Sequence, residues 1–144
     1  MKTTDEPVII SETYPVPVQE LWTALTDHQR MIQWYFDDIP AFKPVVGFET
    51  SFPVYVEDRQ FTHCWKVTDV SENRLIKYDW SYAEHNGIAS VAFELTPKDD
   101  GSHLKLRVEI HEDFPADIPE FDREACVGGW NYFLGERLKE FLGD

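Results

Sequence analysis

Five histidines are the residues best suited to chemistry, and they are scattered along the chain. They are His28, His63, His85, His103 and His111. No two of them have the HxxxH or HExxH spacing that places two imidazoles on one face of a helix, as a zinc site often requires. The sequence therefore predicts no metal site and calls for no cofactor.

His63 is the histidine with two plausible roles. It alternates with Phe61 and Trp65, and alternate residues of a strand share one face of the sheet. We expect that face to point inward. His63 is then either a polar anchor inside a pocket or a core histidine that is hydrogen-bonded to a neighbour, and the pattern leaves both open.

Other reactive groups form no catalytic constellation. Asp79 and Glu94 fall on the polar faces of their expected strands, which predicts solvent-facing charge rather than a carboxylate pair. Cys64 and Cys126 belong to no CxxC pair and are expected to be reduced thiols. No Gly-x-Ser-x-Gly elbow or phosphate-binding glycine loop occurs. We assign no catalytic residue, and the sequence favours a protein that is not an enzyme over one that is.

The net charge of −14 limits the partners. Nucleic acids and anionic membranes both need a basic surface, so neither is expected. Acidic residues are densest after the sixth expected strand, at Glu112, Asp113, Asp117 and Glu120. This cluster is either a docking site for a basic partner or a solvated loop that leads into a helix start.

The positions of strands and helices follow from residue type and spacing. Residues 7–14 are β-branched and predict a first strand. Val18, Leu21, Trp22 and Leu25 have helical spacing, and a second short helix follows around Met31 to Tyr35. Five further strands are expected at 48–56, 59–70, 74–82, 88–96 and 102–111, which makes six in all. Asn86-Gly87 predicts a hairpin turn between the strands at 74–82 and 88–96.

A long helix is expected to cover the apolar face of this sheet. The strands alternate between apolar and polar residues, which is typical of an antiparallel sheet covered on one side. A stretch of about 22 residues from Pro119 has helical periodicity and would be roughly 33 Å long. Gly128 and Gly129 lie inside it, at a cost of about 1 kcal/mol each relative to alanine. They indicate either close approach of another element or space kept open beside the helix.

Aromatic residues make up 15% of the chain, and many fall on the inward faces. Small-molecule pockets are lined mainly by such side chains with a few polar anchors, here His63 or Asn131. The alternative is that the same side chains fill the core completely. The candidate pocket residues are Trp34, Phe52, His63, Trp65, Tyr78, Trp80, Phe93, Trp130, Asn131, Phe133 and Leu134.

Several segments together resemble one known family. The motifs are Leu21-Trp22, Ala24 to Asp27, Trp34-Tyr35-Phe36, residues 66–70 and 74–80, residues 90–97, and Gly129-Trp130. Together they resemble the START-like superfamily, in the branch of the activator of the heat-shock-protein-90 ATPase, over roughly Val8 to Leu142. Where the family commonly has Trp-Phe after the second helix, this chain has Trp34-Tyr35-Phe36, which adds a hydroxyl near the expected rim of the cavity.

The resemblance implies an α+β helix-grip fold, written here as an expectation. A curved antiparallel sheet of six to seven strands would wrap around a long C-terminal helix, with two short helices after the first strand. We expect residues 1–144 to form one domain, with no signal peptide or membrane span, in the cytoplasm.

Three functions remain open at this point. The first is non-enzymatic binding of a small apolar molecule, lipid-like or aromatic, in a cavity between sheet and helix. The second is a co-chaperone-like protein that stimulates a chaperone ATPase. The third is a cyclase or hydrolase acting inside the cavity. A monomer and a homodimer are both compatible with the sequence.

Overall fold

The structure is a computed structural model that describes residues 1–143. It confirms the predicted α+β class, with two short helices after the first strand and a C-terminal helical stretch. In chain order the elements are β1 (Val8–Tyr14), α1 (Val18–Thr26), α2 (His28–Trp34), β2 (Glu49–Val56), β3 (Arg59–Ser71), β4 (Leu75–Tyr82), β5 (His85–Lys98), β6 (Gly101–Glu112), the 3₁₀ turn η1 (Pro119–Phe121), α3 (Arg123–Tyr132), the π-helical turn η2 (Phe133–Arg137) and α4 (Leu138–Leu142).

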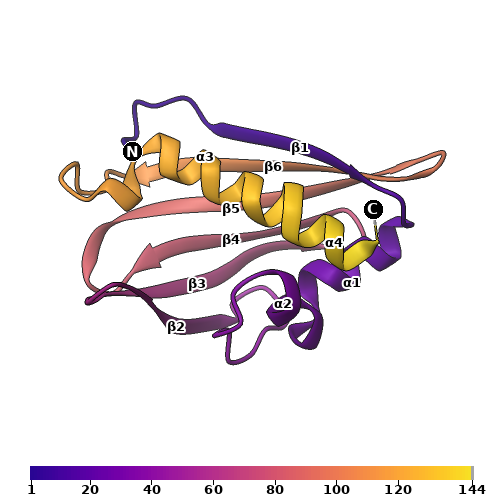
Figure 1. Cartoon of the computed structure of the whole chain (residues 1–144), viewed down its shortest axis with the longest axis horizontal. Helices are drawn as coiled ribbons and strands as arrows, with labels where there is room; N and C mark the ends of the chain where they lie inside the picture. The colour runs from indigo at the N-terminus through magenta and orange to yellow at the C-terminus, as the bar shows by residue number, and fades with distance from the viewer. Residues whose placement is uncertain (144) are drawn as a thin grey trace.

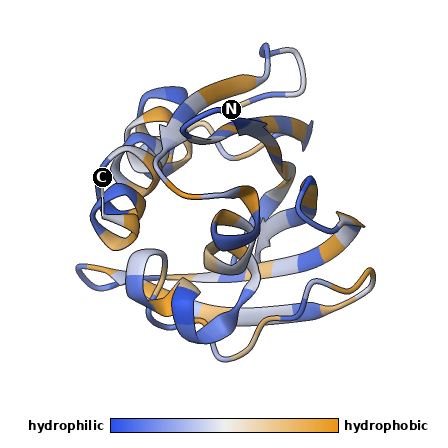
Figure 2. Cartoon of the chain, turned by 90° about the vertical axis from the view of Figure 1, so that its right-hand side faces the viewer, coloured by the Kyte–Doolittle hydropathy of each residue, from blue (hydrophilic) through white to orange (hydrophobic). Residues whose placement is uncertain are grey.

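The six strands form one antiparallel sheet in the order β1-β6-β5-β4-β3-β2. Strands β2 to β6 follow one another as hairpins, and β1 joins the far edge beside β6. The sheet is curved, and its concave face is covered by helices (Figures 1 and 2). The alternation of buried and exposed residues along β6 places Leu104, Leu106 and Val108 inward, as the sequence predicted.

Different helices cover the two ends of the concave face. The continuous stretch α3-η2-α4 runs diagonally across the sheet, and α1 and α2 lie beside its α4 end (Figure 1). The N-terminus lies at the opposite end, beside the start of α3 (Figure 1). Within residues 1–143, no helix combines the length and apolar character that crossing a membrane requires.

The last helix begins later than predicted. Pro119 opens only the 3₁₀ turn η1, and Asp122 is extended, with φ −84° and ψ 167°. The Asp122 carboxylate accepts a hydrogen bond from the backbone N–H of Ala125 and so caps α3. An aspartate at this position satisfies a free helical N–H, which a proline at the first turn does not do.

The β4–β5 turn also differs from the prediction. Tyr82 pairs with His85, so the chain reverses at Ala83 and Glu84 rather than at Asn86-Gly87. Gly87 lies inside β5 with φ +121°, and a Cβ there would overlap the ring of Phe114. The glycine is therefore needed for a bulge and for close approach of an aromatic ring, not for a hairpin turn.

The C-terminal helix is fixed to β1 at the π-helical turn. The Tyr14 hydroxyl donates to the backbone carbonyl of Leu134 over 2.7 Å, in a buried position. Next to it, Gly135 faces Glu12, whose carboxylate also pairs with the ammonium group of Lys139 at 2.9 Å. Close approach of another element thus occurs at Gly135, a helix glycine for which no prediction was made from the sequence.

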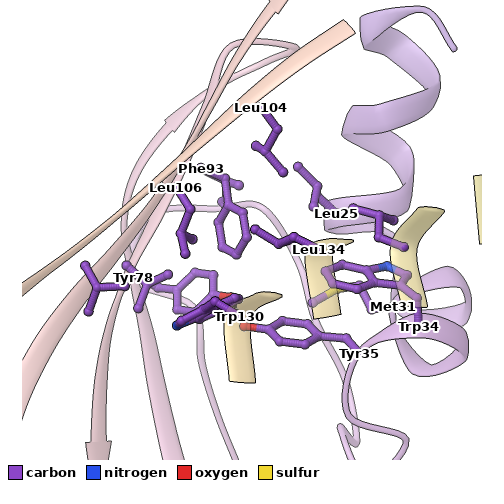
Figure 3. Close-up of a cluster of buried hydrophobic side chains, with 14 of the residues drawn as sticks. Leu25, Met31, Trp34, Tyr35, Tyr78, Phe93, Leu104, Leu106, Trp130 and Leu134 are labelled. Atoms are coloured by element: carbon purple, nitrogen blue, oxygen red, sulfur yellow. Dashed lines mark hydrogen bonds between the residues drawn. The ribbon is translucent and has the colours of Figure 1, made fainter. Parts of the chain in front are cut away.

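The α1–α2 end of the interior is solidly filled. Figure 3 shows Leu25, Met31 and Trp34 packed with Leu134 and with side chains of the sheet. Trp34 is fully buried, and its indole N–H donates to the carbonyl of Ala24 over 2.7 Å. Trp34 is therefore both packed and hydrogen-bonded, whereas the buried indole N–H of Trp65 has no partner among residues 1–143.

Replacing Tyr14 by phenylalanine should destabilise the fold. The change leaves the buried Leu134 carbonyl without its side-chain donor, at a cost of about 1–3 kcal/mol in the free energy of unfolding. Denaturant titration measures this loss. Tyr132→Phe removes the same group from an exposed side chain and should change stability by less than about 0.5 kcal/mol. Equal losses in the two variants would contradict the assigned role of Tyr14.

Candidate ligand-binding cavity

A cavity of about 200 Å³ lies between the concave face of the sheet and α3. Its floor is formed by β4, β5 and β6, and its roof by α3 and Phe133. Met1, η1 and Phe114 close one side. The lining residues are Met1, Phe36, His63, Trp80, Tyr82, Ala89, Val91, Val108, Ile110, Phe114, Glu120, Phe121, Ala125, Cys126, Gly129, Trp130 and Phe133.

Side-chain size along β5 explains where the cavity lies. The inward residues are Ala89, Val91, Phe93 and Leu95, in that order along the strand. The two small residues line the cavity, while Phe93 belongs to the filled end. The interior therefore changes from packed to hollow as side chains shorten toward the β4–β5 turn.

Four of the predicted pocket residues line the cavity, namely His63, Trp80, Trp130 and Phe133. Six others are buried but belong to the packed core next to it. These are Trp34, Phe52, Trp65, Tyr78, Phe93 and Leu134. Periodicity placed them inward, but which inward residues touch open space depends on the neighbouring helices.

Asn131 is the predicted anchor that points the wrong way. It is exposed, whereas the preceding Trp130 is buried. Consecutive residues of an α-helix differ by about 100° in direction, so both cannot face the sheet. Asn131 is therefore not part of the cavity wall.

The hydroxyl of Tyr35 lies in the core rather than at a rim, contrary to the expectation. Its ring stacks on Trp34 with centroids 4.6 Å apart, and its hydroxyl lies 2.8 Å from that of Tyr78. Burial raises the pKa of both phenols well above the ordinary value, so both stay neutral. Phe36, the next residue, lines the cavity instead and packs on His63 and Phe133.

His63 combines both roles that the sequence left open. It is 6% exposed and lies on the cavity wall among the rings of Phe36, Phe52, Trp80 and Tyr82. Its Nδ1 lies 3.0 Å from the carbonyl oxygen of Phe61. Burial lowers the pKa of His63 to about 4, against a partial rise from this hydrogen bond. The imidazole is therefore neutral at pH 7.

The two glycines in α3 leave open space. A Cβ built at Gly128 or Gly129 would meet no atom within 4 Å, so no other element approaches them closely. Gly129 lines the cavity, and both it and Ala125 are exposed at its rim. Close approach of another element is therefore excluded for both glycines, and room beside the helix is supported at Gly129, which lines the cavity, whereas Gly128 does not line it.

Sequence reasoning missed most of the small and rim residues of the cavity. Ala89, Val91, Val108 and Ile110 follow the alternation expected of β5 and β6, but alternation does not predict that these positions border open space. A usable signal was present, because small inward residues of β5 coincide with a helix that carries two adjacent glycines. Met1 gave no comparable signal, since its place depends on contacts with the distant Phe114 and Phe121.

The four acidic residues predicted to bind a partner have different environments. Glu112, Asp113 and Asp117 are exposed, and Asp113 accepts a hydrogen bond from the backbone N–H of Thr3. Glu120 lies at the cavity and is paired with both terminal nitrogens of Arg59. These hydrogen bonds lower the pKa of the Glu120 carboxyl. Glu120 is thus already held within the chain.

Cys126 lies on the cavity wall and Cys64 on β3, and both are free thiols. Burial raises the pKa of Cys126 to about 11, so the thiol is protonated at pH 7. Over residues 1–143, no three His, Cys, Asp or Glu side chains gather in a way that could hold a metal ion.

The sheet, the long helix and the cavity between them define a protein of the helix-grip, START-like class. The chain belongs to the family described as Activator of Hsp90 ATPase homolog 1-like protein, whose profile matches residues 15–143. This confirms the resemblance seen in the sequence. No curated protein matches the chain significantly.

Solved structures share the fold. DynU16, a protein in the dynemicin biosynthetic locus, is 24% identical with a TM-score of 0.77, and the match covers 96% of this chain and 48% of DynU16. The chain therefore spans about half the length of that protein. MLL2253 from Mesorhizobium loti is 25% identical with a TM-score of 0.77, covering 96% and 97% of the two chains. CV1439 from Chromobacterium violaceum is 16% identical with a TM-score of 0.79 and the same coverage.

The neutral state of His63 predicts a pH-dependent stability. Its pKa is about 4 in the folded protein and about 6.5 when unfolded, so the unfolded state binds more protons between these values. The free energy of unfolding should therefore fall on acidification, by on the order of 3 kcal/mol from this group between pH 7 and pH 4. Denaturant titrations of wild type and His63→Phe across this range isolate the contribution.

The free energy of unfolding should change more steeply with pH in the wild type than in His63→Phe, because the variant lacks the titrating group. A stability difference that stays constant from pH 7 to pH 4 would contradict the buried, neutral imidazole. Histidine resonances followed by NMR provide a direct check of the same pKa.

Proposed function

We propose that this protein binds a small apolar molecule, without catalysis, in the cavity between the sheet and α3. The observation that carries the proposal is the cavity itself, about 200 Å³ of space whose walls are mostly aliphatic and aromatic. Such walls, with few polar groups, are typical of small-molecule sites. The membership in a START-like family supports the same interpretation at the level of the fold.

Apolar walls that are left unpacked lose contacts, which supports a use for the cavity. A closed and empty cavity of about 200 Å³ would cost about 5 kcal/mol at about 24 cal/mol per Å³, and this cavity costs less because it opens at the rim formed by Ala125 and Gly129. Larger residues at Ala89 or Val91 would reduce that cost. Gly129 in the opposing helix adds to it, because glycine is a poor helix former.

The size of the cavity indicates a compact occupant. An apolar protein cavity of about 150 Å³ is large enough for benzene. A space of about 200 Å³ therefore suits a molecule with one substituted ring or a small bicyclic system. Of the two ligand types expected from the sequence, aromatic and lipid-like, this volume favours the aromatic one.

Calorimetric titration with p-xylene tests the proposal. We expect the wild-type protein to bind this probe with a Kd of roughly 0.1–1 mM, as eight carbon atoms in an apolar site allow. Ala89→Leu adds three carbons on the cavity floor and should weaken binding at least tenfold. Ala92→Leu is the matched control, because Ala92 lies on the same strand but does not line the cavity.

Two results would contradict the proposal. One is the absence of p-xylene binding to the wild-type protein, together with no small molecule retained by the purified protein in native mass spectrometry. The other is equal loss of binding in Ala89→Leu and Ala92→Leu, because binding would then not depend on the cavity floor.

A second candidate function is stimulation of an Hsp90-type chaperone ATPase. It is supported by the family description and by the exposed carboxylates of Glu112, Asp113 and Asp117, which a basic surface could contact. Opposite charges of this kind steer association more than they add affinity. The effect should therefore decrease as salt concentration rises.

Charge reversal tests this second candidate. In an ATPase assay with a bacterial Hsp90-type chaperone, Glu112→Lys/Asp117→Lys should lower the stimulated rate severalfold at low salt. Asp99→Lys/Asp100→Lys makes the same charge change on the exposed β5–β6 turn and should leave the rate unchanged. An unchanged ATPase rate at saturating wild-type protein would rule the candidate out.

A further inference from the structure

The hydrogen bond from His63 determines which imidazole nitrogen can meet a ligand. The Nδ1 atom lies 3.0 Å from the carbonyl oxygen of Phe61, and a carbonyl oxygen can only accept. Nδ1 must therefore carry the proton. In the neutral imidazole, Nε2 is then a lone-pair acceptor with no proton of its own.

The Nε2 atom is left without a protein partner. Within residues 1–143 it makes no hydrogen bond. The only fully enclosed side-chain nitrogen or oxygen without a partner in this range is Trp65 Nε1. The Nε2 atom of His63 is therefore not fully enclosed. His63 is 6% exposed and lies on the cavity wall, which indicates that the accessible surface of Nε2 faces the cavity.

Tyr82 supplies a complementary polar group on the same wall. Its ring centroid lies 4.8 Å from that of His63. The Tyr82 oxygen accepts a hydrogen bond of 2.9 Å from the indole N–H of Trp80, and the Tyr82 proton has no acceptor within the described part of the chain. Burial raises the pKa of Tyr82 to about 12, so this proton is retained at neutral pH.

A hydroxyl group matches this pair of polar groups best. It can donate its proton to Nε2 of His63, and its oxygen can accept the proton of Tyr82. An ether or a ketone offers no proton to Nε2, and a hydrocarbon leaves both groups unpaired. Unpaired polar groups in an apolar site reduce affinity, so the wall discriminates by chemistry as well as by shape.

We propose that the ligand is a compact aromatic alcohol whose hydroxyl donates to Nε2 of His63, with Tyr82 as the donor to its oxygen. This inference rests on the proposed function, since it names the ligand class for the same cavity. The cavity walls hold the ring, and the two polar residues orient it. Both residues bind and position, and no bond is made or broken.

The pair p-cresol and p-xylene tests this inference, because the two molecules have nearly the same shape and differ in one hydroxyl. Calorimetry should show that His63→Phe lowers the affinity for p-cresol about tenfold and changes the affinity for p-xylene by less than threefold. Tyr82→Phe should likewise weaken p-cresol selectively. Phenylalanine keeps an aromatic ring at each position, among neighbours that are themselves aromatic.

A measurement on the wild-type protein makes the test independent of the stability of the variants. In ¹⁵N NMR spectra, p-cresol should shift the Nε2 resonance of His63, and p-xylene should leave it nearly unchanged. Binding of p-xylene by calorimetry, at the same time, reports on the cavity alone.

The outcomes separate the two claims. Binding of both probes without selectivity in the variants and without a p-cresol-specific Nε2 shift would overturn the alcohol assignment and leave the proposed cavity function standing. An equal loss of affinity for p-cresol and p-xylene in His63→Phe would also overturn it, because His63 would then contribute to the shape of the cavity and not a hydrogen bond. Binding of neither probe to the wild-type protein would overturn both claims.

Discussion

One helix cannot cover a six-stranded sheet, and this mismatch of widths governs the structure. Six strands about 4.8 Å apart span roughly 24 Å, whereas a helix with its side chains is about 10–12 Å across. The sheet therefore curls around α3-η2-α4, and α1 and α2 cover the remaining width at one end only (Figures 1 and 2). The other end, beneath α3 and beside Met1, keeps the cavity.

Buried polar groups have different partners at the filled end and at the cavity end. At the filled end, Trp34 and Tyr14 donate to main-chain carbonyls, and Tyr35 pairs with Tyr78. Burying such a group without a partner costs about 1–3 kcal/mol, and the Trp65 indole N–H is the one described side-chain group at this end that is left unpaired. At the boundary with the cavity, His63 satisfies one nitrogen through Phe61 and leaves the other toward the open space. The capacity to recognise a ligand thus arises where the filled core ends.

The fold was predictable from sequence because it depends on repeated local patterns. Alternation along β3 to β6 placed Phe61, His63 and Trp65 inward, and the motifs around Trp22 and Trp34 indicated the helix-grip family. Errors occurred where one residue had two possible uses. Asp122 rather than Pro119 starts the last helix, and Gly87 accommodates Phe114 rather than forming a turn. The cavity was only partly predictable, because Phe93 and Val91 share a face yet differ in what the helices leave above them.

Ligand binding as proposed requires the space between β5 and α3 to be an accessible apolar site. A crystal structure of the wild-type protein under xenon pressure tests it most directly, because xenon enters apolar cavities without needing hydrogen bonds. We expect an anomalous xenon peak between Ala89 and Trp130, with little movement of the surrounding side chains. A structure in which Trp80, Trp130 and Phe133 close this space, with no xenon in it, would show that there is no such site.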